Sequence, residues 1–349
     1  MLRSMRKIWL LAILTVWGLV GYFVWDFARE ENINLLSPIS KLAKNVPIPA
    51  LTTREQLKAA SRFQSDILNI LVIGTDSSAF RRAKGQGGFN TDSLILVSIN
   101  PSTNKVLLTS VPRDLWINGN KINALYTVFG EDVLVDAFEK ITGQYVDGVI
   151  RADFDSFEWI IDAVGGVPVN VERTFTDTTF PNRADTNVIT ISFAQGPQTL
   201  TAERALVFSR SRHGDNGEGS DLMRAKRQHL VLEGLVQAIS QPTSKYWPMN
   251  VETFYNAVTS VGNIYTTLSL ADTKYLWDFY KDKDLYTVES FVIGDEYIYH
   301  PTEGYIAWVF IPREPTFSTL HRDIVTKLNN ITIPDQPLES VQPQPSPAL

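Results

Sequence analysis

The chain contains no cysteine among its 349 residues. Thiol catalysis, disulfide bridges and cysteine-based zinc sites are therefore excluded. The net charge is −6 rather than positive, so the protein as a whole is not a general nucleic-acid binder and any anion site must be local. Histidine is scarce too, and no pair has the short spacing of a helical zinc site among His213, His229, His300 and His321.

One long uncharged run is present near the start of the chain, at residues 8–25 (IWLLAILTVWGLVGYFVW). It is just long enough to cross a membrane as a helix. Residues 1–7 carry three basic side chains and acidic ones predominate after the run, so the positive-inside rule predicts a cytoplasmic N-terminus and an exported remainder. A cleaved signal peptide is the alternative, but the run is long for one and no small-residue cleavage site follows it. We therefore expect a single-pass anchor, and export without disulfides fits a bacterial cell surface.

The remaining chain divides where its composition changes. Residues 26–66 are polar and interrupted by proline, which predicts an extracytoplasmic stalk with a helix near residues 53–64. Residues 67–330 alternate strand and helix patterns, which predicts an α/β fold: a layered α-β-α domain with a central mixed β-sheet. Residues 331–349 are rich in proline and predict a disordered tail.

Two aspartates flank a glycine-rich loop. Asp76 directly follows a buried-strand pattern (ILNILVIGT), and Asp92 precedes the next strand (SLILVSIN). Ligand sites of open α/β sheets gather at the carboxyl ends of strands, and Mg²⁺ binds phosphate together with one or two carboxylates. We therefore consider Asp76 and Asp92 as ligands of Mg²⁺ (or Mn²⁺). The alternative is that each is a turn or helix-cap residue.

A third polar cluster follows the second strand of a predicted hairpin. Arg113 leaves the end of this strand (KVLLTSVPRD) toward the same region. A surface salt bridge with Asp114 is the other interpretation of this arginine. Lys121 and Asn123 lie shortly afterwards and add further polar groups, without a role that the sequence defines.

A basic segment spans residues 210–228 (RSRHGDNGEGSDLMRAKRQ). Its first part is predicted as a short helix or strand, and on a strand Arg210 and Arg212 would point to the same side. Asp221 begins a predicted helix over residues 221–238 and shares one face of it with Arg224 and Gln228.

Arg227 lies next to this helix face. Neither Arg224 nor Arg227 has an acidic residue four positions away, as an ordinary solvated helix would provide. Planar guanidinium groups in excess over acids suit a diphosphate, which accepts paired hydrogen bonds from each of them. The segment therefore predicts an anion site rather than a solvated face.

These motifs together resemble the LytR-CpsA-Psr family. GTDS, NTDSLILVSINPSTNKVLLTSVPRD, KIN, DFDSFEWIIDAVGGVPVNV and ALVFSRSR…DLMRAKRQ occur in the family's order, over about residues 67–240. The resemblance implies a membrane-anchored bacterial phosphotransferase that moves a glycopolymer from a polyprenyl diphosphate carrier onto peptidoglycan. It implies partners of those two kinds and the membrane, and no nucleic acid.

The resemblance also assigns roles to residues. Asp76 and Asp92 match the metal-associated positions, and Asp221 matches an acidic position that supports the basic ones. The diphosphate-binding positions are matched by Arg113, Arg210, Arg212, Arg224 and Gln228. Of all these we expect the catalytic set to be Asp76, Asp92, Arg113 and Arg210, supported by Asp221, Arg227, Lys121 and Asn123.

Two positions depart from the family pattern. Ser78 and Asn90 stand where the family often has arginine, although Arg81 and Arg82 follow closely. These changes reduce the positive charge around the head group. They affect the expected strength of binding more than the expected reaction.

Two other functions use the same residues. A hydrolase would cleave the polyprenyl diphosphate with water as acceptor. A non-catalytic envelope protein that binds anionic wall polymer would need the arginines but not Asp76 and Asp92.

For a transferase, the sequence does not decide whether Asp92 or Asp114 is the general base. Apolar residues that either line a lipid tunnel or form plain core are Val133, Phe138, Phe154, Phe157, Trp159, Ile160, Leu230 and Leu235.

Overall fold

A computed structural model describes residues 54–63, 65–85, 89–239, 251–260, 264–304 and 307–330. No helix within these ranges is long and apolar enough to cross a membrane. The expected anchor, most of the stalk and the proline-rich tail lie outside the described residues and stay predictions.

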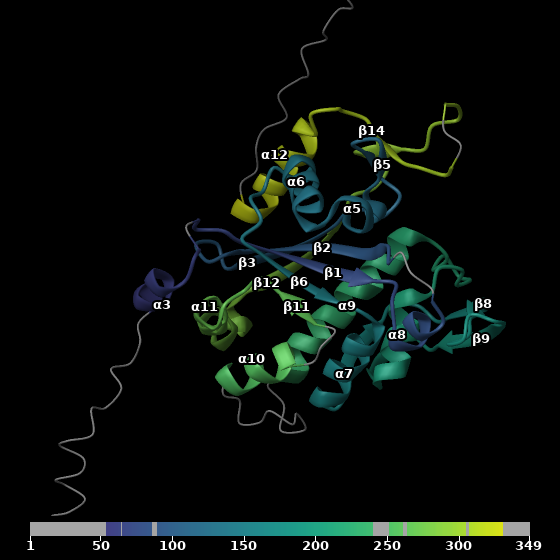
Figure 1. Cartoon of the computed structure of the whole chain (residues 1–349), viewed down its shortest axis with the longest axis horizontal. Helices are drawn as coiled ribbons and strands as arrows, with labels where there is room; N and C mark the ends of the chain where they lie inside the picture. Colours follow the sequence, from purple (N-terminus) through teal and green to yellow (C-terminus); the bar gives the residue numbers. More distant parts are fainter. Residues whose placement is uncertain are drawn as a thin grey trace, which may run out of the picture. The chain divides into compact units, whose positions relative to one another are not determined.

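A mixed six-stranded sheet forms the centre of the described unit (Figure 1). Its strand order is β11–β6–β1–β2–β3–β12. The strands are β1 (Leu68–Thr75), β2 (Thr91–Asn100), β3 (Lys105–Ser110), β6 (Gly148–Ala152), β11 (Tyr265–Thr266) and β12 (Thr287–Val292). β1, β3, β6 and β12 run in one direction, and β2 and β11 run in the other. The carboxyl ends of four strands and the start of β2 therefore meet at one edge, as the sequence predicted for the mixed sheet.

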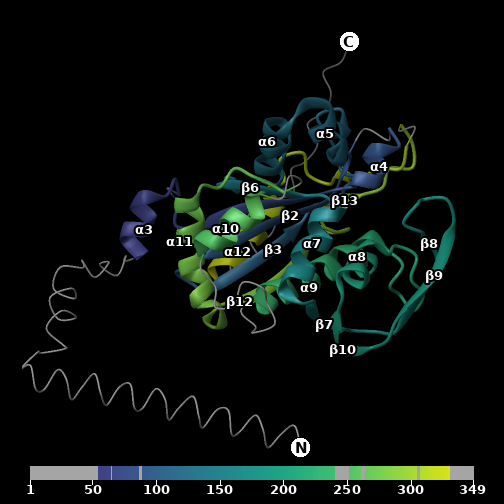
Figure 2. The ribbon, with the colours of Figure 1, turned by 60° about the horizontal axis from the view of Figure 1, so that its bottom comes forward.

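Helices cover both faces of this sheet (Figures 1 and 2). On one face lie α5 (Ile122–Phe129), α6 (Glu131–Thr142) and α12 (Ser318–Asn329), and on the other α7 (Phe154–Val164), α9 (Asp221–Ile239), α10 (Val251–Ser260) and α11 (Leu270–Lys281). Alternation along β1 explains both layers, because successive strand residues point to opposite faces. Leu71 and Ile73 pack with the α5–α6–α12 core, whereas Leu68 and Ile70 pack with α11.

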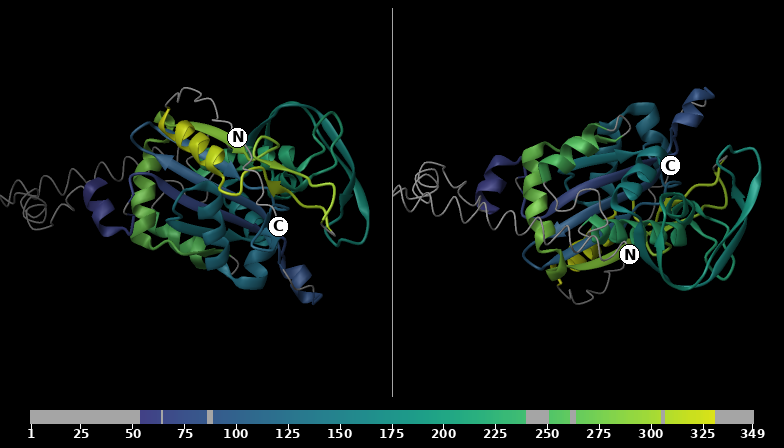
Figure 3. Two further views of the ribbon diagram at one scale, coloured as in Figure 1. Left: turned by 90° about the horizontal axis from the view of Figure 1, so that it is seen from above. Right: turned by 90° about the horizontal axis from the view of Figure 1, so that it is seen from below.

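A smaller α/β portion continues beyond one end of the sheet. It contains α8 (Ala202–Arg210), the paired strands β7 (Val167–Val171) and β10 (Gly196–Leu200), and the hairpin of β8 (Phe175–Pro181) and β9 (Val188–Phe193). Figure 3 shows the teal hairpin extending away from the sheet. Rings of Phe175, Phe193 and Phe208 pack together in its core, with centroids 5.0–6.2 Å apart.

Short elements complete the described structure. They are α3 (Arg54–Ala60), α4 (Ala79–Ala83), β4 (Trp116–Ile117), β5 (Asn120–Lys121), the 3-10 helix η1 (Lys283–Leu285), β13 (Ile298–Tyr299) and β14 (Ile311–Pro312). The helix ends follow local chemistry. Gly143 ends α6 in the left-handed conformation, and the Thr201 side chain accepts from the Arg204 amide to begin α8.

The apolar residues considered for a lipid tunnel belong to different cores. Val133 and Phe138 pack in the α5–α6–α12 core, whereas Phe157 and Ile160 pack in the core of α7, α8 and α9. The two groups lie in separate layers, so they do not line a common tunnel in the described structure. The helical spacing of these four residues therefore reflects packing in the two cores.

Gly234 sets how closely α9 approaches β7. A Cβ atom at this position would overlap the carbonyl oxygen of Pro168. Alanine normally stabilises an exposed helix by about 1 kcal/mol relative to glycine, but overpacking destabilises by about 1–3 kcal/mol. We therefore expect Gly234→Ala to lower the free energy of unfolding in a urea titration. Gly294→Ala is the matched control, because its Cβ would meet only one atom, 3.9 Å away. Equal stability of the two variants would contradict the close packing.

Candidate functional site

Asp92 occupies a β-bulge at the start of β2. Gly74 pairs with Ser93 and Thr75 pairs with Thr91, so Asp92 is an extra residue without a partner on β1. A Cβ atom at Gly74 would lie 2.9 Å from Cβ of Ser93, which explains the glycine. Bulges bend a strand locally and redirect a side chain. The bulge therefore presents the Asp92 carboxylate at the edge where the strand ends meet.

Asp76 lies at the same edge, directly after β1. Its amide donates to the Asn90 carbonyl at 3.0 Å, which ties it to the residues just before β2. Its carboxylate forms an ion pair with Arg81 at 2.8 Å. Arg81 also contacts Asp185, at the tip of the β8–β9 hairpin, at 3.1 Å. Arg81 thus supplies a positive charge near Ser78, the position at which the family often has arginine.

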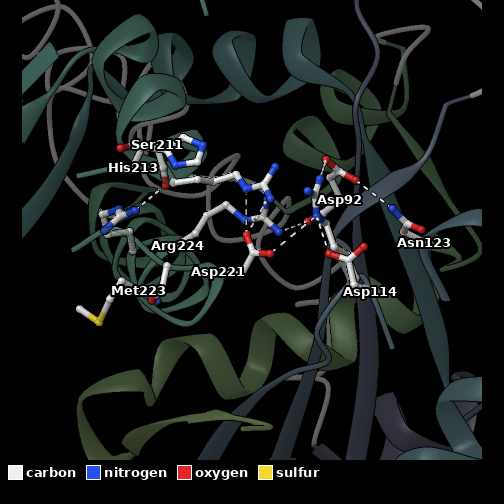
Figure 4. Close-up of polar contacts among 12 residues, drawn as sticks. Asp92, Asp114, Asn123, Ser211, His213, Asp221, Met223 and Arg224 are labelled. Atoms are coloured by element: carbon white, nitrogen blue, oxygen red, sulfur yellow. Dashed lines mark hydrogen bonds and ion pairs between the residues drawn. The ribbon is translucent and has the colours of Figure 1, made fainter. Parts of the chain in front are cut away.

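Arg113 joins the end of β3 to Asp92. Its Nη1 lies 2.5 Å from the Asp92 carboxylate, whereas its Nε lies 3.5 Å from Asp114 (Figure 4). Nε also lies 3.9 Å from Asp221. The expected alternative, a salt bridge with Asp114, is therefore a weaker contact than the one with Asp92. Asn123 donates to the other Asp92 oxygen at 3.3 Å, and Lys121 pairs with Asp114 at 2.6 Å. Both supporting residues that the sequence suggested thus lie in this network.

The start of α9 brings a second set of charges to Asp92. Arg224 donates to the Asp92 carbonyl at 3.2 Å. Asp221 accepts from Nε of Arg212 at 3.0 Å and lies 3.4 Å from Nη1 of Arg224 (Figure 4). Asp221 and Arg224 therefore share the predicted helix face, and this face points at β2.

Farther along α9, two side chains fasten the helix to the sheet. Gln228 accepts from the Ser93 hydroxyl at 3.1 Å. The buried His229 ring contacts Ser110 of β3 at 2.7 Å and, through its other nitrogen, Ser290 of β12. Burial lowers the pKa of His229 to about 4, so the ring is neutral at pH 7. These contacts hold the arginine-bearing start of α9 against the strand ends.

The strand-based expectation for Arg210 and Arg212 is wrong. Arg210 is the last residue of helix α8, and extended backbone begins only at Ser211. The two guanidinium groups consequently diverge. Arg210 lies over the ring of Phe154, 4.2 Å from its centroid, whereas Arg212 pairs with Asp221.

The site holds buried positive charge with unused donors. Burial lowers the pKa of Arg210, and it lowers the pKa of Arg224 to about 10 even though Asp221 raises it. Nε of Arg113 and Nε of Arg224 are buried and donate no hydrogen bond among the described residues. Buried polar groups normally have partners. Within the described part of the chain, Nε of Arg113 has only the longer ion pairs with Asp114 and Asp221, at 3.5 and 3.9 Å. Two buried guanidinium donors that make no hydrogen bond therefore indicate a place for an anion.

Arg227 does not belong to this anion-binding set. It is 2% exposed and its Nη1 pairs with Glu218 at 2.8 Å. Its other nitrogens donate to the carbonyls of Phe208 and Ser211. The acidic partner lies nine residues earlier in a loop, so the search at helical spacing missed it. Arg227 holds the loop between α8 and α9 in place.

Asp177 supports the same loop and was missed by the sequence analysis. It is 1% exposed, and its carboxylate accepts from the Ser211 hydroxyl at 2.8 Å and the His213 amide at 3.2 Å. Burial alone would raise its pKa, but these hydrogen bonds lower it. Asp177 thus fixes the backbone on both sides of Arg212. No local pattern marks this role, because the two loop residues that Asp177 holds, Ser211 and His213, are more than thirty residues away.

Asp76 and Asp92 suit a divalent cation only together with a ligand. Among the described residues, no three acidic, histidine or cysteine side chains gather as a metal site. Mg²⁺ bound with phosphate uses one or two carboxylates and completes its shell with phosphate and water oxygens. Two carboxylates at neighbouring strand ends fit that donor set. Each is ion-paired with an arginine here, so metal binding requires these contacts to be exchanged.

Comparison with known proteins places this geometry in a family. The model of the LytR_cpsA_psr family matches residues 41–310. The chain belongs to the LytR_cpsA_psr family.

Curated members of the LytR_cpsA_psr family are similar over much of this chain. The polyisoprenyl-teichoic acid–peptidoglycan teichoic acid transferase TagU of Bacillus subtilis is 28% identical over 247 residues, which cover 67% of this chain and 71% of that protein. TagU of Oceanobacillus iheyensis is 31% identical over 212 residues, which cover 58% of this chain and 56% of that protein.

Solved structures confirm the mixed α/β fold. The Lin1025 protein of Listeria innocua is 26% identical with a TM-score of 0.54, covering 76% of this chain and 100% of that one. TagT bound to LIIa-WTA is 24% identical with a TM-score of 0.56, covering 76% of this chain and 92% of that one. The LytR_cpsA_psr fold therefore accounts for the sheet and the helices that surround the site.

The buried His229 predicts a pH dependence of stability. Its folded pKa of about 4 lies below the ordinary value of 6.5, so the unfolded chain binds a proton more readily. This contribution to stability is present above pH 6.5 and is lost as the pH falls toward 4, by up to about 1.4 kcal/mol per pH unit. Urea titrations between pH 7 and 5 should show a shallower decline for His229→Gln than for the wild type. Parallel declines would contradict the buried neutral ring.

The contacts of Arg227 predict a structural defect when it is removed. Arg227→Ala leaves the buried Glu218 with only its 3.8 Å ion pair to Arg173 among the described residues, and breaking a buried ion pair typically destabilises by about 3–5 kcal/mol. We expect a clear drop in the midpoint of thermal unfolding, whereas Arg204→Ala, an arginine near the surface of the neighbouring helix, changes it little. An unchanged midpoint would contradict this structural role of Arg227.

Proposed function

We propose that this protein transfers a glycopolymer from a polyprenyl diphosphate carrier onto peptidoglycan and forms a phosphodiester link. Membership in the LytR_cpsA_psr family supports this reaction, and the relatives TagU and TagV carry the name of teichoic acid transferases acting from a polyisoprenyl carrier to peptidoglycan. The protein is accordingly an enzyme of the glycopolymer transferase class. The observation that supports the proposal most strongly is that Nε of Arg113 and Nε of Arg224 are buried near Asp92 and donate no hydrogen bond among the described residues.

The arginines are the diphosphate-binding residues in this proposal. Nε of Arg113 and Nε of Arg224 make no hydrogen bond among the described residues, and each planar guanidinium can donate two hydrogen bonds to the same phosphate. Phe154 keeps the Arg210 guanidinium in one orientation by lying under it. Asp221 orients Arg212 and Arg224 together. A site with fixed positive groups needs little rearrangement while charge moves in the transition state.

Asp76 and Asp92 are the residues that would hold Mg²⁺ (or Mn²⁺) in this proposal. The cation would neutralise negative charge on the diphosphate oxygens. Arg81 and Arg113, which pair with these carboxylates in the described structure, would then be released toward the phosphates. The total charge of the site therefore stays balanced when cation and diphosphate bind together.

The reaction is a displacement at phosphorus. A hydroxyl of peptidoglycan attacks the phosphorus that bears the glycopolymer, a new oxygen–phosphorus bond forms, and the bond to the bridging oxygen breaks. Polyprenyl phosphate leaves, and its growing negative charge is stabilised by the arginines. The hydroxyl proton passes to a carboxylate, for which Asp92 and Asp114 are the two candidates. Positioning and charge neutralisation supply most of the catalysis in such transfers.

The N-terminal sequence supports a cellular location for this reaction. The uncharged run at residues 8–25 supports a single-pass anchor in a bacterial cell membrane, with residues 1–7 in the cytoplasm. The catalytic domain would then lie outside the membrane. Both a lipid-linked donor and peptidoglycan are accessible on that side.

Removing Arg210 should abolish most transfer without unfolding the domain. Loss of one preorganised charge contact typically lowers the rate by about 10²–10³-fold. The full chain in detergent is incubated with a short-chain polyprenyl diphosphate glycan, a peptidoglycan fragment and Mg²⁺, and conjugates are measured by mass spectrometry. Arg210→Ala should lose the phosphodiester conjugate, and Arg204→Ala, on the same helix, should retain it. Transfer by Arg210→Ala within a few-fold of the wild type would refute the assignment.

The same assay separates the other two functions. Free glycan phosphate without a conjugate would indicate the hydrolase. Donor binding without turnover, unchanged in Asp76→Asn and Asp92→Asn, would indicate a binding protein. The transferase instead requires both aspartates for turnover.

A further inference from the structure

A cleft of about 550 Å³ opens on the α5–α6 side of the sheet. Its walls include Tyr126 of α5, Glu131 at the start of α6, Arg151 of β6 and Tyr265 of β11. The volume lies within the range of roughly 300–1,000 Å³ found for small-ligand pockets. None of these side chains belongs to the arginine and aspartate network of the candidate site.

Arg151 is the unusual residue of this cleft. Its Cζ lies 4.7 Å from the ring centroids of both Tyr126 and Tyr265. It forms no ion pair or hydrogen bond with any residue that the structure describes, although partial burial lowers its pKa. Guanidinium groups that are drawn away from water normally pair with an acid. The donors of Arg151 are therefore available to an anionic ligand.

The cleft adjoins the candidate site through two elements. Asn123, which contacts Asp92, precedes Tyr126 on α5 by three residues, or about 4.5 Å along the helix axis. Arg151 pairs in register with Ile73, three residues before Asp76. A ligand in the cleft can consequently extend to the reacting groups.

The cleft also lies on the side that the reaction requires. Val149 and Arg151 point to the same face of β6, and Val149 packs in the α5–α6–α12 core. Arg224, one of the proposed diphosphate-binding arginines, comes from α9, which covers the opposite face of the sheet, and it lies with Arg212 around Asp221. In-line displacement needs the attacking hydroxyl opposite the leaving group. The acceptor should therefore approach from the α5–α6 side.

The lining chemistry suits an acidic sugar. Tyrosine offers a flat apolar face with a polar tip, which matches the CH face and hydroxyls of a sugar ring. Arg151 suits a carboxylate, and Glu131, which accepts from the Tyr265 hydroxyl at 3.3 Å, can accept from a sugar hydroxyl. A prenyl chain fits poorly, because it would leave Arg151 and Glu131 desolvated without partners.

We propose that this cleft is the subsite for the peptidoglycan acceptor, with Arg151 binding a carboxylate of the muramyl peptide and the two tyrosines packing against the glycan. The proposal rests on the proposed transferase function. It assigns Arg151 to acceptor binding and not to the diphosphate.

Binding of the acceptor alone tests this assignment. The full chain in detergent is titrated by calorimetry with a disaccharide–tetrapeptide that has free carboxylates, with the same compound amidated, and with a glycerol phosphate oligomer. Arg151→Gln should raise the Kd of the free-carboxylate compound at least tenfold, whereas Arg204→Gln, an arginine over the Phe193 ring, should not. Amidation should weaken wild-type binding similarly, which gives the same answer without any substitution.

Each other outcome overturns the assignment. Unchanged affinity in Arg151→Gln, or equal binding of the amidated compound, removes the carboxylate contact. Arg151-dependent binding of the glycerol phosphate oligomer alone assigns the cleft to the donor polymer. The transfer assay distinguishes the failure of this proposal from the failure of the proposed function. If Arg151→Gln transfers the glycopolymer with an unchanged KM for the acceptor, only the assignment of the cleft is refuted. If the acceptor binds in an Arg151-dependent way but no transfer occurs, only the proposed reaction is refuted.

Discussion

The ion pair between Asp92 and Arg113 joins the start of β2 to the end of β3, and the rest of the site is arranged around it. The bulge in β2 presents this carboxylate, and α9 places Arg224 on its backbone carbonyl. The first of these features is the irregular register of β2, and the second is positioned by α9, which packs closely on β7 at Gly234. The chemistry of the site thus depends on a defect in one strand and on a glycine in one helix.

Charge balance explains how such a site can exist before a ligand arrives. Burying an unpaired charge is unfavourable, and here Asp76 and Asp92 each neutralise an arginine that the proposed function assigns to phosphate or its surroundings. In the proposed function, a cation and a diphosphate that bind together would exchange these partners without adding net unpaired charge. The same two aspartates could then serve as partners of arginine before binding and as metal ligands afterwards.

The sequence predicted those parts of the structure that local chemistry determines. Short sequence patterns predicted the strands that end just before Asp76 and Arg113. The alternation of strand and helix patterns predicted the mixed sheet. The sequence did not predict contacts between distant segments. The acid that neutralises Arg227 lies in a loop, the ring under Arg210 comes from α7, and the support of Arg212 by Asp177 crosses from the β8–β9 hairpin. Such contacts depend on tertiary packing, which spacing along one element does not reveal.

The most direct test is a crystal structure of the protein with a short polyprenyl diphosphate and Mg²⁺. The account predicts that the diphosphate lies against Nε of Arg113 and Nε of Arg224, with the cation on Asp76 and Asp92 and the Asp92–Arg113 ion pair broken. A diphosphate bound elsewhere, with this ion pair intact and both Nε atoms still without acceptors, would contradict it.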